Sequence, residues 1–199
     1  MEENIKPSPT VKAELKAAQD KAAKPLLWVG IVSMVMLFAG LTSAYVVRAD
    51  NGNWLIFKMP TIFILSTAVI ITSSLTLFLA LKMAKQNNNK GVIIGVLTTF
   101  ILGLIFTKMQ FMGWSELTNK GIVFAGKYAN ASGSFLYVLT GLHLLHLFGG
   151  LIALLITLKN SVKRKYNAQN TLGLELCSIY WHFLDILWVY LFLFLYYIR

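Results

Sequence analysis

Five long apolar runs dominate this 199-residue chain. About 20 helical residues cross a hydrocarbon layer roughly 30 Å thick, and each run is long enough to do so. Strands that span a membrane would instead alternate apolar and polar residues over stretches of about ten, a pattern that the chain does not show. The runs are residues 26–47, 60–81, 91–111, 135–158 and 174–198. We therefore predict an all-α integral membrane bundle of five transmembrane helices.

The composition agrees with a membrane protein. Hydrophobic residues make up 57% of the chain and charged residues 13%, which is far from a soluble globular domain. The net charge of +10 does not indicate nucleic-acid binding, because the basic residues lie in short connections beside apolar runs. We expect a polar tail at residues 1–25, part of it a short helix, followed by a transmembrane domain at residues 26–199.

The distribution of Lys and Arg predicts the orientation. The N-terminal tail, the second connection and the fourth connection hold 12 of the 18 basic residues. Because cytoplasmic segments are enriched in Lys and Arg, we expect a cytoplasmic N-terminus and an external C-terminus.

A few polar residues within the apolar runs are the candidate functional groups. Intramembrane ionisable residues are costly and usually face other parts of the protein. The fourth run carries His143 and His146, and the fifth carries Glu175, His182 and Asp185 at spacings that place each set on one helix face. His143 and Asp185 should lie at a similar depth. We hypothesise an interhelical polar layer in which a histidine of the fourth run meets His182 or Asp185.

Other uses of these histidines stay open. Two facing imidazoles could ligate a b-type haem, and His143, His146, His182 and Asp185 could bind a metal, although the repeated Glu and ExxH pattern of di-iron bundles is missing. A transporter would more often show broken helices or paired repeats. Hydrogen-bonded histidines that join helices are the interpretation we favour.

Small residues recur every four positions in two of the runs. They are Gly40 and Ala44 in the first run, and Gly91, Gly95, Thr99 and Gly103 in the third. Such faces allow membrane helices to approach closely. We expect them to pack within this chain rather than against a partner.

Several sequence blocks, taken in order, carry a family resemblance. They are residues 33–48, 59–60 with 72–74, 102–114 including Gln110, 133–149 with both histidines, and 175–188 with the segment YWHFLD. Together they resemble subunit III of haem-copper oxidases of the cytochrome c oxidase type, in its short five-helix form. The resemblance covers residues 28–198. One departure is Met34, where many relatives carry a membrane-embedded carboxylate, so any role of that carboxylate does not carry over.

The resemblance implies a subunit that is not catalytic by itself. Such a subunit supports subunit I of a proton-pumping terminal oxidase in a bacterial-type inner membrane and binds lipid. Haem and copper are then expected in the partner subunits I and II and none in this chain, with subunit I as the direct partner and other respiratory complexes as further ones. A quinol oxidase subunit III, a stand-alone membrane cytochrome and a non-redox scaffold remain alternatives.

The same resemblance suggests where lipid binds. Acyl chains would lie in a groove between the first two helices and the last three. Lys163, Arg164 and Lys165 would meet anionic headgroups at the cytoplasmic surface, although the three charges could also serve only to set the topology.

Overall fold

The computed structural model describes residues 9–50, 52, 54–126 and 129–198. These residues form five α-helices and no strand. The helices are α1 (Pro9–Asp50), α2 (Ile62–Lys85), α3 (Asn89–Asn119), α4 (Ala131–Val162) and α5 (Leu172–Tyr197). All five are long and apolar enough to cross a membrane, which confirms the predicted fold class. The orientation across the membrane stays a prediction.

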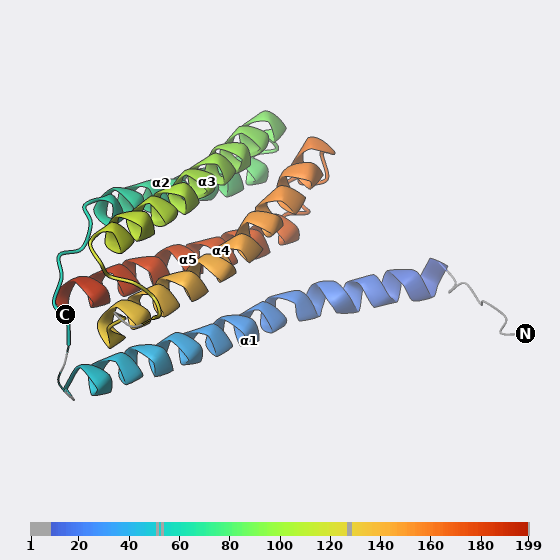
Figure 1. Ribbon diagram of the computed structural model, residues 1–199. Helices are drawn as coiled ribbons and strands as arrows, with labels where there is room; N and C mark the ends of the chain where they lie inside the picture. The colour runs from blue at the N-terminus through green and yellow to red at the C-terminus, as the bar shows by residue number, and fades with distance from the viewer. Residues whose placement is uncertain (1–8, 51, 53, 127–128, 199) are drawn as a thin grey trace, which may run out of the picture.

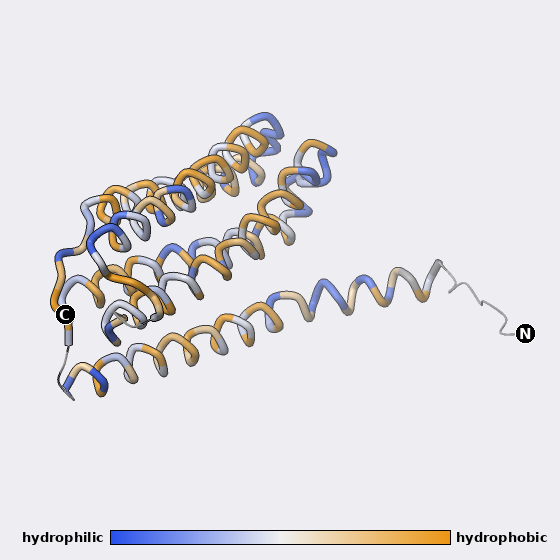
Figure 2. Tube along the Cα trace, in the orientation of Figure 1, coloured by the Kyte–Doolittle hydropathy of each residue, from blue (hydrophilic) through white to orange (hydrophobic). Residues whose placement is uncertain are grey.

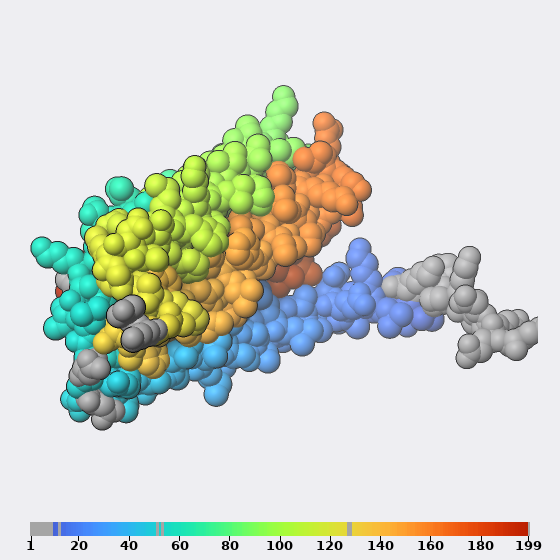
Figure 3. Space-filling view, in the orientation of Figure 1, coloured from blue at the N-terminus to red at the C-terminus, as the bar shows by residue number. Residues whose placement is uncertain are grey.

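Helix α1 is much longer than the first apolar run. Its 42 residues would extend about 60 Å, roughly twice the thickness of the hydrocarbon core. The helix expected in the polar tail exists, but it continues without a break through Pro25 into the membrane span. Figure 2 shows the change along α1 from a mixed, polar N-terminal part to an apolar one, and Figure 3 shows the N-terminal part extending beyond the other helices.

The helices are arranged in three tiers (Figure 1). Helices α2 and α3 form one antiparallel pair, α4 and α5 form a second pair beneath it, and α1 lies along the far side of α4 and α5. Among the described residues, α1 packs against α4 and α5 and does not reach α2 or α3. The first two helices in sequence are therefore on different sides of the bundle.

The small-residue face of α3 packs against another helix of this chain, whereas that of α1 does not. At Gly95 of α3, an added Cβ would lie 2.7 Å from the Cβ of Ala80 on α2, so the close approach of these helices requires glycine. This confirms packing within the chain for α3. At Gly40 of α1, an added Cβ would meet nothing within 4 Å, and Ala44 is exposed. The expectation of in-chain packing was wrong there, because α1 turns this face away from α4 and α5.

The α2–α3 and α4–α5 connections are hydrogen-bonded to each other at one end of the bundle. Asn88 caps α3 by accepting a hydrogen bond from the Gly91 amide, and Asn87, with a φ of 58°, accepts one of 2.9 Å from the Ala168 amide. This second bond ties the α2–α3 turn to the α4–α5 connection. Both connections therefore lie at the same end, as an antiparallel bundle requires.

Candidate functional site: the intramembrane polar residues and two grooves

Two buried indoles join α5 to α2. Trp181 Nε1 donates to Ser73 Oγ, and Trp188 Nε1 donates to Thr67 Oγ1, both at 3.0 Å. A polar group within hydrocarbon must find its partner inside the protein, and these pairs satisfy that requirement. These two indole bonds were not predicted from the sequence. Ser66 and Ser73, seven residues apart in an apolar run, were the signal that could have indicated the polar face of α2.

Further side-chain bonds join α3 to its neighbours. Gln110 Nε2 donates to Ser66 Oγ at 3.1 Å, and the hydroxyls of Thr99 and Thr76 lie 2.7 Å apart between α3 and α2. Between α3 and α4, Trp114 Nε1 donates to Thr140 Oγ1 at 3.1 Å. The bundle is thus joined mainly by indole, amide and hydroxyl groups.

His143 is fully buried on α4 among aromatic rings. Its ring centre lies 5.2 Å from that of Trp188 and 6.2 Å from that of Phe106. Within the described part of the chain, neither ring nitrogen has a hydrogen-bond partner. The imidazole therefore packs as an aromatic ring and does not act as the hydrogen-bonded link that we predicted.

His146 lies where α4 meets α1 and α5. Its Nδ1 lies 2.7 Å from the carbonyl of Leu142 on the same helix, and its ring centre is 5.9 Å from that of Phe38 on α1. The hydroxyl of Tyr180 on α5 donates to the backbone carbonyl of His146 at 3.1 Å. The link to α5 thus uses the main chain of His146 instead of its ring.

His182 and Asp185 face α2. His182 Nδ1 forms a hydrogen bond with the Ser74 hydroxyl, so this histidine does join two helices. Asp185 is 4% exposed, and over the described residues no hydrogen bond of normal geometry reaches either of its carboxylate oxygens. It lies beside Ser74 and Ile71 of α2.

The predicted pairing between the two sets is therefore not formed. No hydrogen bond or ion pair between the described residues joins His143 or His146 to His182 or Asp185. The reason lies in the rotation of α5, which places Trp188 against His143 and turns Asp185 toward α2.

Glu175 lies in the first turn of α5, outside the polar layer in which we placed it. Its carboxylate accepts hydrogen bonds from Lys24 Nζ at 2.7 Å and from Thr171 Oγ1 at 2.8 Å. Both charged side chains are partly exposed. The ion pair attaches the polar part of α1 to the start of α5.

The three basic residues Lys163, Arg164 and Lys165 are exposed where α4 ends. Lys165, together with Lys16 and Asp20 of α1, borders a groove of about 510 Å³ between the polar part of α1 and the α4–α5 connection. The side chains of all three are available to a ligand at this end of the molecule.

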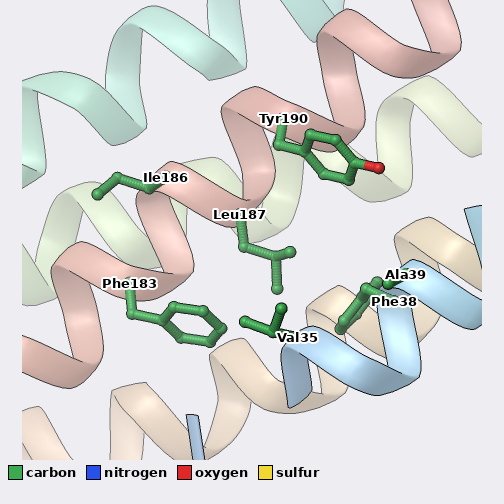
Figure 4. Close-up of a pocket in the computed structure, with 7 residues that line it drawn as sticks. All are labelled: Val35, Phe38, Ala39, Phe183, Ile186, Leu187 and Tyr190. Carbon is green, nitrogen blue, oxygen red and sulfur yellow. The ribbon is translucent and has the colours of Figure 1, made fainter. Parts of the chain in front are cut away.

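A second, apolar groove runs between α1 and α5 (Figure 4). Its volume is about 360 Å³, and its lining residues are Val35, Phe38 and Ala39 of α1 with Phe183, Ile186, Leu187 and Tyr190 of α5. We predicted a groove between the first two helices and the last three. That position was wrong, because α2 packs on α3 and α5 while α1 stands apart from it.

The fold and these contacts define an integral, multi-pass helical membrane protein whose intramembrane polar groups hold helices together. The family model described as cytochrome c oxidase subunit III matches residues 10–199. The chain belongs to the cytochrome c oxidase subunit III family. It is a non-catalytic subunit of a haem-copper oxidase and works with other oxidase subunits.

Individual relatives agree with this assignment. A probable cytochrome c oxidase subunit 3 of Nocardia farcinica is 33% identical over 184 residues, which cover 87% of this chain and 86% of the relative. Cytochrome c oxidase subunit 3 of Bacillus sp. strain PS3 is 30% identical over 170 residues, 83% of this chain and 80% of the relative. Subunit 3 of the cytochrome bo(3) ubiquinol oxidase of Pseudomonas aeruginosa is 29% identical over 170 residues, with 83% and 79% covered.

Proposed function

We propose that this chain packs directly on subunit I of a proton-pumping terminal oxidase that takes electrons from cytochrome c. Its place is the bacterial inner membrane, with the N-terminus in the cytoplasm. The observation that carries this proposal is the family match over residues 10–199, which covers all five helices. Haem and copper belong to subunits I and II, and this chain contributes a supporting surface.

The outward face of α1 supports a role in assembly. Its apolar residues, including Val32, Met36 and Val47, are exposed in the isolated chain. A Cβ added at Gly40 would meet nothing within 4 Å among the described residues, and Ala44 on the same helix is exposed. A small-residue face on a transmembrane helix suits a second helix at short distance.

Purification of the complex tests the proposal. The tagged chain, extracted in mild detergent, should carry oxidase subunits I and II in intact-complex mass spectrometry, and the complex should oxidise reduced cytochrome c. The chain purified alone should show no Soret band. Recovery of the chain without any oxidase subunit, or with haem bound to it alone, would contradict the proposal.

A reporter fusion tests the proposed orientation. An enzymatic reporter that works only outside the cytoplasm should be active when fused to the C-terminus and inactive when fused to the N-terminus.

A quinol oxidase is the second candidate. The relative from Pseudomonas aeruginosa, which is a subunit of a ubiquinol oxidase, is nearly as similar as the cytochrome c oxidase relatives. Turnover of the purified complex with quinol and not with reduced cytochrome c would establish it.

We also propose that the subunit binds an anionic phospholipid. The headgroup lies at Lys163, Arg164 and Lys165, and the α1–α5 groove holds acyl chain. Basic side chains at a membrane surface attract anionic headgroups by about 1 kcal/mol each.

Replacing all three residues by Gln should lower the amount of anionic lipid that co-purifies with the chain. The matched control replaces three basic residues elsewhere in the chain, Lys58, Lys108 and Lys120. If the amount of co-purified anionic lipid is unchanged in the first variant, the three charges serve only to set the orientation of the chain in the membrane.

A further inference from the structure

The groove of about 510 Å³ at the polar part of α1 (the polar groove) lies outside the apolar spans. The part of α1 that borders it, from Lys16 to Ala23, precedes the first apolar run, and α5 contributes residues from its N-terminal end. Molecules dissolved in water and lipid headgroups can therefore reach it. The α1–α5 groove, by contrast, lies within the membrane span and is lined almost entirely by apolar side chains.

Helix α5 begins at the polar groove without a side-chain cap. Thr171, at the N-cap position, makes no capping bond, because its hydroxyl donates to the Glu175 carboxylate instead. The first backbone hydrogen bond of the helix is donated by the Glu175 amide. The amides of the three residues before it, 172–174, thus have no partner among the described residues. Free amides and the helix dipole attract anions to such an N-terminus.

Tyr166 places a free hydroxyl over the same turn. Its side chain is 6% exposed, yet within the described part of the chain its hydroxyl has no hydrogen-bond partner. A Cβ added at Gly173 would lie 2.9 Å from the hydroxyl oxygen, so the glycine allows this group to lie directly against the first turn of α5. A phenol buried to this extent normally forms a hydrogen bond. Its partner must be an occupant of the polar groove, which Tyr166 lines.

The charges around the polar groove are mostly positive. Lys16 of α1 and Lys165 of the α4–α5 connection border it, and neither forms an ion pair with a described residue. Asp20 is the one acid among the lining residues. Glu175, in the first turn of α5, is already paired with Lys24. An anion in the groove would therefore meet more positive than negative charge.

We propose that the polar groove binds a phosphate group at the N-terminus of α5, carried by a soluble phosphate compound or by a phospholipid headgroup. The amides of the first turn and the Tyr166 hydroxyl donate hydrogen bonds to the phosphate oxygens, and Lys16 and Lys165 balance the charge. The side-chain amides of Asn160 and Gln169, which also line the groove, contact the rest of the ligand.

This site goes beyond the proposed headgroup contact with the three charges at the end of α4. Of those three residues only Lys165 lines the polar groove, and the groups that define the site come from α1, from α5 and from Tyr166. The site also stands apart from the assignment to an oxidase, because this chain supplies all of its groups. Failure of the chain to co-purify with oxidase subunits would leave it unaffected.

Titration calorimetry of the full chain with inorganic phosphate, in neutral detergent at low salt, measures the site. Tyr166→Phe keeps the ring but removes one hydrogen bond, and Lys16→Gln removes one charge, so each should weaken binding roughly threefold to tenfold. Asp20→Asn should strengthen binding, because it removes the one negative charge of the lining. Lys163→Gln is the matched control, since Lys163 is exposed on the same connection but does not line the groove. Its affinity should equal that of the unaltered chain.

The phospholipid that co-purifies with each variant identifies the source of the phosphate. If inorganic phosphate binds and the lipid content is the same in all variants, the ligand is a soluble phosphate compound. If phosphate does not bind and lipid is lost from Tyr166→Phe and Lys16→Gln but kept by Lys163→Gln, the ligand is a headgroup. The proposal is overturned if neither measurement responds to Tyr166→Phe and Lys16→Gln, because the groove then holds only water. An equal loss in Lys163→Gln would overturn it too, since general surface charge would then explain the attraction.

Discussion

The indole nitrogen of Trp181 donates a hydrogen bond to the hydroxyl of Ser73, 3.0 Å away, with both side chains buried between α5 and α2. The two residues lie 108 positions apart in the sequence, so this bond helps to fix how the second and fifth helices dock. It is one of two indole bonds between the described residues of these helices.

We expect Ser73→Ala to lower the free energy of unfolding by about 0.5 to 2 kcal/mol, the range for hydrogen bonds between membrane helices. The indole N–H would remain buried without its acceptor. A double-mutant cycle with Trp181→Phe, measured by unfolding in mixed detergent micelles, should show coupling between the two positions. Ser33→Ala is the control, because Ser33 is exposed and bonds to its own helix at Val29. Additive effects in the cycle would contradict the bond.

The contact of Gly95 with Ala80 predicts a steric effect. An added Cβ at Gly95 would lie 2.7 Å from the Ala80 Cβ and 3.2 Å from the Thr76 carbonyl, so α2 and α3 would have to separate. We expect Gly95→Ala to destabilise the fold by about 1 to 3 kcal/mol, as overpacking does, despite the higher helix propensity of Ala. Gly40→Ala, where nothing lies within 4 Å, should be neutral or slightly stabilising. Equal thermal stability of the two variants would rule out the close approach.

His143 and His182 should respond differently to the same substitution. His143→Leu removes a buried polar ring that has no partner among the described residues, so stability should stay the same or rise. His182→Leu breaks the bond to Ser74 and should cost about 1 kcal/mol. Thermal unfolding of both variants in detergent provides the comparison. A large loss for His143→Leu would mean that its imidazole has a polar partner.

The ion pair between Lys24 and Glu175 should contribute little to overall stability. Because both side chains are partly exposed, we expect Glu175→Gln to cost less than about 1 kcal/mol and the cost to shrink at high salt. Distances between spin labels on α1 and α5 should nevertheless broaden, since this pair holds the polar part of α1 in place. Unchanged distance distributions would contradict that role.

The sequence predicted the five helices because hydrocarbon thickness dictates the length of an apolar span. It also indicated the residues that are polar within the membrane. It could not predict their partners, because the rotation of each helix depends on packing. Asp185 and Trp188 are three residues apart on α5, yet one faces α2 and the other faces His143. The position of the groove was missed for a related reason, since chain order does not reveal that α1 packs away from α2.

Pro25 has a consequence for the motion of α1. A proline lacks the amide hydrogen that would bond to the carbonyl four residues earlier, so the helix is locally weaker between Lys21 and Pro25. This weak turn lies where the polar part of α1 meets its membrane span, and Lys24 fastens the same turn to Glu175. Pro25 thus marks a flexible point in α1, and the ion pair of Lys24 with Glu175 restrains it. When this ion pair breaks, the polar part of α1 can tilt while the rest of α1 stays packed on α4 and α5.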